Sequence, residues 1–470
     1  VRQKLLYTLA LLVVVRIGCQ IPIPGTDSSV ISQILGSFDS DDAMGFFSAF
    51  TGGSFENMSL FALNITPYIT SSIIMQLLTI AIPRLEELQR DGETGRKKIA
   101  EITRYLTIAL SIIESLAMAI GFGNQGLFGD TSSKAQYFLV ILTAVVTMTA
   151  GSALLMWFGE RITENGVGNG ISIILMINII ARIPDDLMNL FESKVMITEA
   201  NGRSVLGAAS AAIIILAVII AMIAFIVILN GGERRIPVQY AKKVQGRKML
   251  GGQSSHIPLK VNTSGVIPVI FAQSILQIPI IISQLTGYKG TGPWAYILVI
   301  FASSLMQFPV IISSILGKQP GDGTLWGKVL KLLSQGYWFD ISNPRAFAYT
   351  LGYVLYAVLV IAFAYFYTSI TFNPIEVANN IKKQGGFIPG IRPGKPTEEY
   401  LTKLLNNIVF IGAVGLLIVA TIPLVFSGIF DAKVSFGGTS LIIVVGVILE
   451  TLNKISAMMV VRNYKGFLDD

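Results

Sequence analysis

Residues 59–82 read SLFALNITPYITSSIIMQLLTIAI, a run of 24 mostly apolar residues. Such a run is long enough to cross a hydrocarbon core about 30 Å thick as a helix. The 34 residues before it (25–58) hold five acidic and no basic side chains, whereas the 22 residues after it hold six Lys or Arg. Because Lys and Arg are enriched in cytoplasmic loops, the stretch predicts a span whose carboxyl end lies in the cytoplasm.

The same alternation of apolar runs and basic gaps continues along all 470 residues. About ten runs qualify as spans, near residues 5–21, 59–82, 105–122, 137–158, 171–183, 205–229, 265–285, 346–372, 404–426 and 439–460. Basic residues crowd the gaps near 231–263 and 373–403, which places both gaps and both chain ends in the cytoplasm. With 52% hydrophobic and 13% charged residues, the chain has too little polar surface for a soluble protein. We therefore predict an all-α polytopic membrane protein.

The net charge of +7 and the pI near 9.3 come from the cytoplasmic gaps. Anionic lipids or an RNA-containing partner would bind such a face. A solvated cytoplasmic face without a partner is the plainer alternative.

Arg16 is a charge inside the first predicted span. It lies roughly 16 Å along a helix that starts at Leu5, where insertion scales assign Arg a cost of about 2.5–3.5 kcal/mol. We expect its guanidinium to face a wet or polar interior, with snorkelling of the long stem to an interface as the alternative. The charge, and the lack of a small-x-small site, also predict that this span is retained and not cleaved as a signal peptide.

Five local strings are distinctive: RIGCQIPIPG (16–25), LFALNITPYITSSIIMQLL (60–78), GERITENGVGNGISI (159–173), GFIPGIRPG (386–394) and FGGTSLIIVV (436–445). In this order, joined by this number of spans, they resemble the SecY family of bacterial protein-conducting channels over nearly the whole chain. The resemblance implies two pseudo-symmetric halves of five helices, residues 1–186 and 187–470, arranged as a clamshell around an hourglass pore. Inverted repeats of this kind recur in membrane proteins.

The resemblance also implies a function. The chain would translocate unfolded polypeptides across the bacterial plasma membrane and release hydrophobic segments laterally into the bilayer. The implied partners are SecE, SecG, the SecA motor, the ribosome, and the signal sequences of the substrates. No cofactor, no metal and no enzymatic activity are implied.

By position in the matching strings, the family's pore ring and plug fall on defined residues. The ring of aliphatic side chains would comprise Ile69, Ile73, Leu175, Ile179, Ile270 and Ile443. Periodicity alone would assign these residues to packing or lipid contact, but a narrow apolar throat dewets and so blocks ions. The plug would be residues 45–58, with Phe46, Phe47 and Phe50 as its apolar face and Gly52 and Gly53 as its hinge. An amphipathic helix on the outer surface is the alternative.

The lateral gate and the docking surface follow in the same way. The gate would be a polar seam in which Thr70, Ser71, Ser72 and Gln76 face Gln273, Ser274 and Gln277. Hydrogen bonds of this kind average about 0.6 kcal/mol in membranes, so the seam could open; bonding to the local backbone is the alternative. Docking of SecA or the ribosome would use Arg247, Lys248 and Arg392.

Other function classes fit less well. An intramembrane protease needs a Ser–His pair, an Asp pair or a zinc site, yet His256 is the sole histidine. No P-loop appears, so energy would come from a partner or from the membrane potential. A secondary transporter of a small solute is the main alternative, because Gly/Pro-rich broken spans also mark substrate sites.

One departure from the family is a repeat. VIFAQSILQIPIIIS (269–283) recurs as VIFASSLMQFPVIIS (299–313), with ten of fifteen positions identical. If both copies crossed the membrane, the basic gap near 373–403 would lie outside, against the positive-inside rule. We favour the first copy as the seventh span and expect the second to be a re-entrant or surface helix on the outer side. If the second copy spanned instead, Ile300 would take the place of Ile270 in the ring.

Overall fold

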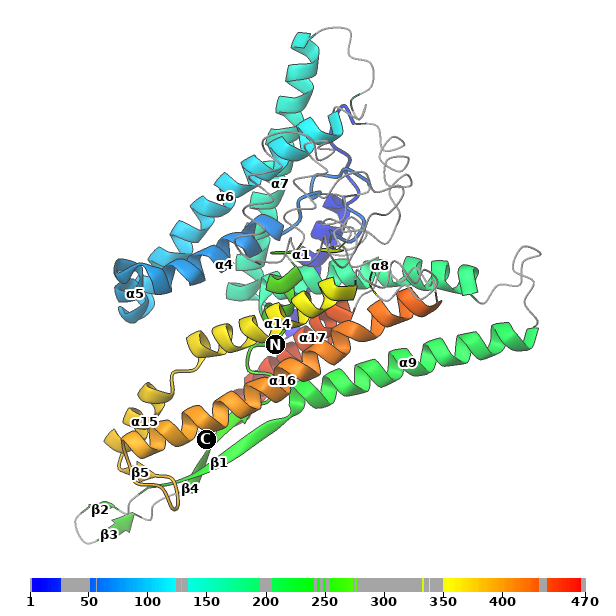
Figure 1. Cartoon of the computed structure of the whole chain (residues 1–470). Helices are drawn as coiled ribbons and strands as arrows, with labels where there is room; N and C mark the ends of the chain where they lie inside the picture. The colour runs from blue at the N-terminus through cyan, green and yellow to red at the C-terminus, as the bar shows by residue number, and fades with distance from the viewer. Residues whose placement is uncertain are drawn as a thin grey trace, which may run out of the picture.

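The computed structural model describes residues 2–26, 51–55, 57–123, 128, 134–194, 205–240, 243–245, 248–250, 254–273, 275–276, 332–333, 338, 350–430 and 438–465. Most of these residues are helical, and the helices lie in two groups (Figure 1). The repeat copy at 299–313 and most of the plug lie outside the described residues. The predictions made for them therefore stay predictions.

The first group of helices comes from the amino-terminal part of the chain. It comprises α1 (Arg2–Gly18), α4 (Thr66–Ala81), α5 (Pro83–Arg90), α6 (Glu93–Gly123), α7 (Lys134–Asn165) and α8 (Gly170–Lys194). Helix α8 continues through the boundary at residues 186 and 187 that we predicted between the halves. The division into two symmetric halves remains a prediction.

The predicted continuous span at 59–82 is wrong in its first third. Residues 59–65 form turns, and α4 begins only at Thr66, with Pro67 in its first turn. Proline is tolerated there because its missing N–H would have no helical partner. At the other end, Pro83 forces Ile82 out of the helical region (φ −112°, ψ 112°), as expected for a residue before proline. Helices α4 and α5 therefore meet at a bend of 106°.

The second group contains α9 (Val205–Gly231), α14 (Leu351–Thr371), α15 (Pro374–Lys383), α16 (Lys395–Phe430) and α17 (Gly438–Lys465). Buried residues of α9, α14, α16 and α17 form one apolar core, which includes Tyr356 and Trp338. The Trp338 indole donates a 2.9 Å hydrogen bond to the carbonyl of Leu332, so its one polar atom is satisfied. This core holds the carboxyl-terminal helices together.

The predicted loop at 231–263 contains a small sheet instead of turns. Strand β1 (Glu233–Tyr240) pairs antiparallel with β4 (Ser254–Lys260) and with β5 (Gly386–Phe387), in the order β4-β1-β5. Strands β2 (Lys243–Gln245) and β3 (Lys248–Leu250) form a separate pair. Burial alternates along β1, where Ile236 and Val238 are buried between exposed neighbours, as the period of a strand requires.

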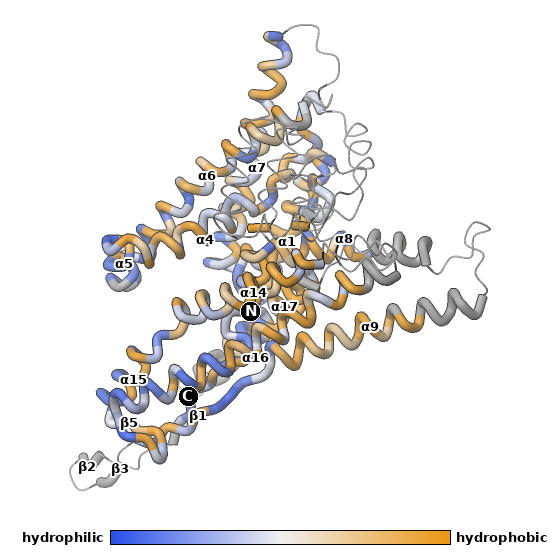
Figure 2. The backbone as a smooth tube through the Cα atoms, viewed as in Figure 1, coloured by the Kyte–Doolittle hydropathy of each residue, from blue (hydrophilic) through white to orange (hydrophobic). Residues whose placement is uncertain are grey.

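Among the described residues, five helices are long and apolar enough to cross a membrane, and six if the bent pair α4–α5 counts as one span. The described parts of α8 and α9 contain shorter apolar stretches, Gly170–Pro184 and Leu216–Gly231. Apolar residues cover the middle of the long helices, whereas hydrophilic residues gather on α5, α15 and β1 (Figure 2). These hydrophilic segments all lie toward one side of the molecule, as expected for a cytoplasmic face.

Candidate functional site

An aliphatic cluster forms where the two groups of helices meet. Its buried residues come from α1, α7, α8 and α17, with half-buried residues of α4 packed against them. Five of the six predicted ring residues belong to it: Ile69, Leu175, Ile179, Ile270 and Ile443. Ile73, half-buried one turn along α4 from Ile69, is not among the described members of the cluster. We call this set of five residues the constriction cluster.

The positions of the cluster residues follow from helix geometry. Leu175 and Ile179 are four residues apart on α8, so they lie on one face of the helix. Ile443 belongs to α17, which packs on α8. Ile270 lies in the helical residues 267–273, which start the predicted seventh span. A cluster of branched aliphatic side chains from four segments leaves no polar group to hold water, which is the chemistry of a hydrophobic seal.

Residues 51–55, part of the predicted plug, are largely buried, and Phe55 belongs to a separate apolar cluster with Ile23 and Met58. Thr51, Ser54 and Phe55 are at most 2% exposed. Gly52 and Gly53 have φ values of +64° and +82°, a backbone conformation that glycine adopts at little cost. Phe46, Phe47 and Phe50, the predicted apolar face of the plug, lie outside the described residues.

Arg16 contacts the backbone of a distant segment of the protein. Its Nη1 donates a 3.4 Å hydrogen bond to the carbonyl oxygen of Gly52, across 36 residues of sequence. The side chain lies in the last turn of α1, where a cation also stabilises the helix carbonyls. This contact differs from the alternative, in which the Arg16 side chain would extend to a membrane interface.

A second polar contact involves Asn178, whose backbone lies close to Gly52. The Asn178 side chain on α8 is 1% exposed and donates a 3.1 Å hydrogen bond from Nδ2 to Oδ1 of Asn64. A methyl group on Gly52 would come within 2.8 Å of the Asn178 carbonyl oxygen and 3.0 Å of Arg16 Nη1. Glycine is therefore required at position 52 by space as well as by backbone conformation.

The predicted polar seam is only partly described. On α4, Thr70 bonds to the carbonyl of Thr66, Ser71 to that of Pro67, and Gln76 to the hydroxyl of Ser72. These bonds stay within α4, which is the local alternative that the sequence left open. Across the seam, Gln273 is buried, whereas Ser274 and Gln277 lie outside the described residues. The gate itself stays a prediction.

The two basic segments that we predicted to be cytoplasmic fold into one unit, which we call the cytoplasmic module. Its apolar core joins β1 and β4 to α15, to residue Ile388 and to the start of α16. Arg392 is exposed on a turn between Gly390 and Gly394, which have φ values of +82° and +108°. Lys248 lies in β3, and Arg247 lies outside the described residues. The segments 231–263 and 373–403 therefore share one apolar core and do not fold as two independent loops.

Comparison with known proteins identifies the family. The SecY family's sequence model matches residues 59–299 and 293–452. The chain is 40% identical over 472 residues to the protein translocase subunit SecY of Halalkalibacterium halodurans, an alignment that covers 99% of this chain and 96% of the relative. It is 41% identical over 475 residues to the protein translocase subunit SecY of Streptomyces galbus, with 99% and 97% covered.

The chain belongs to the SecY family. Solved structures have the same fold: a protein-conducting channel with a TM-score of 0.57 at 18% identity, covering 97% of this chain and 91% of that one. Sec61 from a canine ribosome–channel complex of the endoplasmic reticulum has a TM-score of 0.54 at 17% identity, with the same coverage. The predicted polytopic channel fold is confirmed.

Two contacts of this SecY-family chain were not predicted from its sequence. One is the pair Asn64–Asn178, and the other is an ion pair between Arg104 on α6 and Glu160 on α7. Both join residues more than 50 positions apart, so no periodic pattern reveals them. The sequence feature that could have pointed to these contacts is that Glu160 and Asn64 are polar residues inside two of the five distinctive strings.

Proposed function

We propose that this chain is the pore subunit of a protein translocase, through which unfolded polypeptides cross the membrane. The observation that carries this function is the constriction cluster, combined with the similarity to SecY subunits along the whole chain. A ring of flexible aliphatic side chains excludes ions from a narrow throat and can still adapt to a moving chain of any sequence. Nothing in the similarities supports the secondary transporter that we kept as the alternative.

In this proposal the constriction cluster is the ion seal, and residues 45–58 reinforce it from the outer side. The buried, glycine-hinged residues 51–55 support a segment that can leave and return. Hydrophobic segments would exit laterally between α4 and the seventh span, past Thr70, Ser72, Gln76, Gln273, Ser274 and Gln277. The hydroxyl of Thr70 and the amide of Gln76 bond within α4, so these two bonds need not break when the seam parts.

The cytoplasmic module is the proposed docking site for the machine that drives translocation. Arg392 stands exposed on its turn, and Arg247 and Lys248 lie in the adjacent hairpin region. Such a basic surface would receive acidic protein or ribosomal RNA. SecA and the ribosome are the proposed partners there, SecE and SecG the proposed partner subunits, and signal sequences and anionic lipids the further ligands.

We propose the bacterial plasma membrane as the location, with both chain ends in the cytoplasm. The hydrophilic residues that gather on α5, α15 and β1 (Figure 2), together with the Lys and Arg of the segments 231–263 and 373–403, support this orientation. No enzymatic activity is proposed, because the energy for transport would come from the docked motor or from the membrane potential.

The function is tested by transport in vesicles. The chain would be purified with its co-purifying subunits, reconstituted, and supplied with SecA, ATP and a precursor protein that carries a signal sequence. We expect protease-protected precursor only in vesicles that contain the chain, and a small single-span subunit in the purified complex. A tightly bound small solute in the purified protein, with no precursor uptake, would favour the transporter instead.

A further inference from the structure

The chain segments on both sides of residues 27–50 are tied together at one place. The Ile23 N–H donates to the Met58 carbonyl and the Leu60 N–H donates to the Ile21 carbonyl, each at 2.9 Å. A β-bridge between Pro22 and Ser59 lies between these two bonds. Residues 21–23 and 58–60 therefore pair through their backbones just after α1. We call this pairing the paired base.

Beyond this base, local hydrogen bonds shape residues 51–55, because the Ser54 N–H donates to the Thr51 carbonyl and the Ser59 N–H donates to the Ser54 carbonyl. Met58 and Asn64 adopt positive φ values of 38° and 52° without being glycine. Such a conformation persists only where the surroundings impose it, and it is concentrated at functional and switch regions. At Gly52, the space that a side chain would fill is taken by Arg16 of α1 and Asn178 of α8.

We propose that Arg16 is a positioning residue that latches residues 51–55 in the resting channel. Its guanidinium reaches the Gly52 carbonyl from α1, while the Asn178 carbonyl of α8 takes the space that a larger side chain at position 52 would fill. When Gly52 and Gly53 rotate, the Arg16 bond breaks and the paired base at residues 21–23 and 58–60 remains. Arg16 therefore sets how often the resting channel opens without substrate.

The chemistry of the contact suits a reversible latch. A single bond of 3.4 Å is long for a hydrogen bond, so its loss is readily reversed. Arginine stays charged in either state, so the guanidinium exchanges a carbonyl acceptor for water once the segment moves. A buried neutral donor at this place would be left without a partner in the open state, which would oppose opening.

This inference rests on the proposed function, and the test separates the two. Purified complexes of the parent and of each variant would be reconstituted in planar bilayers, and ion conductance measured with no substrate. Arg16→Met removes the donor and keeps an unbranched apolar stem. Arg16→Lys keeps a charged donor. Arg2→Met removes a cation from the exposed start of the same helix. Precursor transport by the parent, measured in parallel, tests the function itself.

We expect resting conductance to rise roughly fivefold in Arg16→Met, the population change that the loss of one typical hydrogen bond gives. Arg16→Lys should restore part of the tightness, and Arg2→Met should match the parent. Equal tightness of Arg16→Met and Arg2→Met would overturn the latch while parent transport still supports the channel. Equal leakage of Arg16→Lys and Arg16→Met would overturn it as well, because a lost donor would not be the cause.

If Arg16→Met fails to assemble, a second pair of variants tests whether the contacts around Gly52 keep the resting channel shut. Gly52→Ala pushes a methyl group against the Asn178 carbonyl and Arg16 Nη1, so it should also raise resting conductance. Gly92→Ala is the matched control, because Gly92 has a similar φ of +73° with nothing within 4 Å. If Gly52→Ala is as tight as Gly92→Ala, the packing around Gly52 does not hold the channel shut and the proposal is wrong.

Discussion

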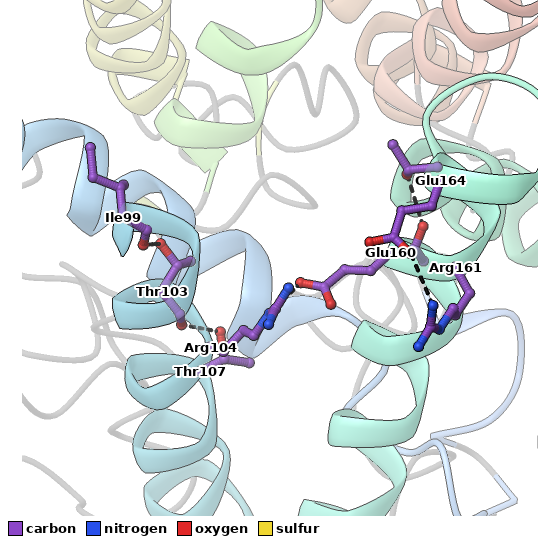
Figure 3. A network of polar contacts seen from close by, with 9 residues as sticks. Ile99, Thr103, Arg104, Thr107, Glu160, Arg161 and Glu164 are labelled. Carbon is purple, nitrogen blue, oxygen red and sulfur yellow. Dashed lines mark hydrogen bonds and ion pairs between the residues drawn. The ribbon is translucent and has the colours of Figure 1, made fainter. Parts of the chain in front are cut away.

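Arg104 on α6 and Glu160 on α7 point toward each other and form an ion pair, with 2.7 Å between Arg104 Nε and Glu160 Oε1 (Figure 3). One turn further on, Arg161 pairs with Glu164 along α7, and its guanidinium lies 5.6 Å from the centre of the Trp157 ring. Of these contacts, the Arg104–Glu160 pair joins two different helices. It ties α6 to α7 near the end where α6 carries its basic residues.

The Arg104–Glu160 pair should contribute a small but measurable amount to stability. The side chains are 46% and 24% exposed, and pairs of this kind contribute about 0.2–1 kcal/mol. A double-mutant cycle with Arg104→Gln and Glu160→Gln, followed by thermal unfolding in detergent, measures the coupling. The Glu93–Lys97 pair within α6 is the control, because at 76% and 85% exposure it should couple less. A coupling no larger than that of the control would mean that the pair does not hold α6 to α7.

Polar substitutions in the constriction cluster should make the resting channel leak. Ile270→Asn or Ile443→Asn places a hydrogen-bonding group in the apolar throat, so water and ions can enter. Substrate-free conductance should rise, and precursors with defective signal sequences should pass more readily. A matched change at Ile228, an exposed residue of α9, should leave conductance unchanged. If both cluster variants stay as tight as the parent, these residues do not form the seal.

Charge reversal at Arg392 should separate docking from assembly. Arg392 is exposed on a turn, so Arg392→Glu should change the free energy of unfolding by about 0.5 kcal/mol or less. Motor-driven transport should fall sharply, because an acidic partner surface would now be repelled. The partner subunits should still co-purify. Equal transport by variant and parent would remove Arg392 from the docking surface.

Close packing at Gly151 predicts a stability effect. A methyl group at Gly151 on α7 would run into the carbonyl oxygen of Leu60, so the turn segment before α4 needs a glycine opposite it. Gly151→Ala should destabilise the fold by about 1–3 kcal/mol, as overpacking does in well-packed interiors. Gly231→Ala, at a site with nothing within 4 Å, is the control. Equal melting temperatures for the two variants would contradict the close approach.

The sequence predicted the parts of this fold that depend on local patterns. Apolar runs placed the long helices, and the cost of a charge within a span singled out Arg16 as a residue in need of a polar contact. Local patterns did not identify the constriction cluster, because periodicity alone assigns such isoleucines to packing or lipid contact. Only the resemblance of the surrounding strings singled them out, and the structure brings five of the six together.

Other features could not be predicted because they depend on distant partners. The late start of α4 reflects residues 57–65 folding against the end of α1 and against Gly151. The third strand of the sheet in the cytoplasmic module, β5, pairs with β1 although its residues lie almost 150 positions later. Short strands with Pro237 and Pro258 inside them look like turns in a sequence.

The central claim is that polypeptide crosses the membrane through the constriction cluster, and site-specific crosslinking tests it most directly. A photoreactive amino acid would be placed at Leu175 or Ile443, and, as the outward-facing control, at Ile228. A precursor would then be arrested midway by a folded domain at its carboxyl end. The account predicts crosslinks from Leu175 and Ile443 to the arrested chain, only while it is arrested, and none from Ile228. Crosslinks from Ile228 with none from the two cluster positions would contradict it.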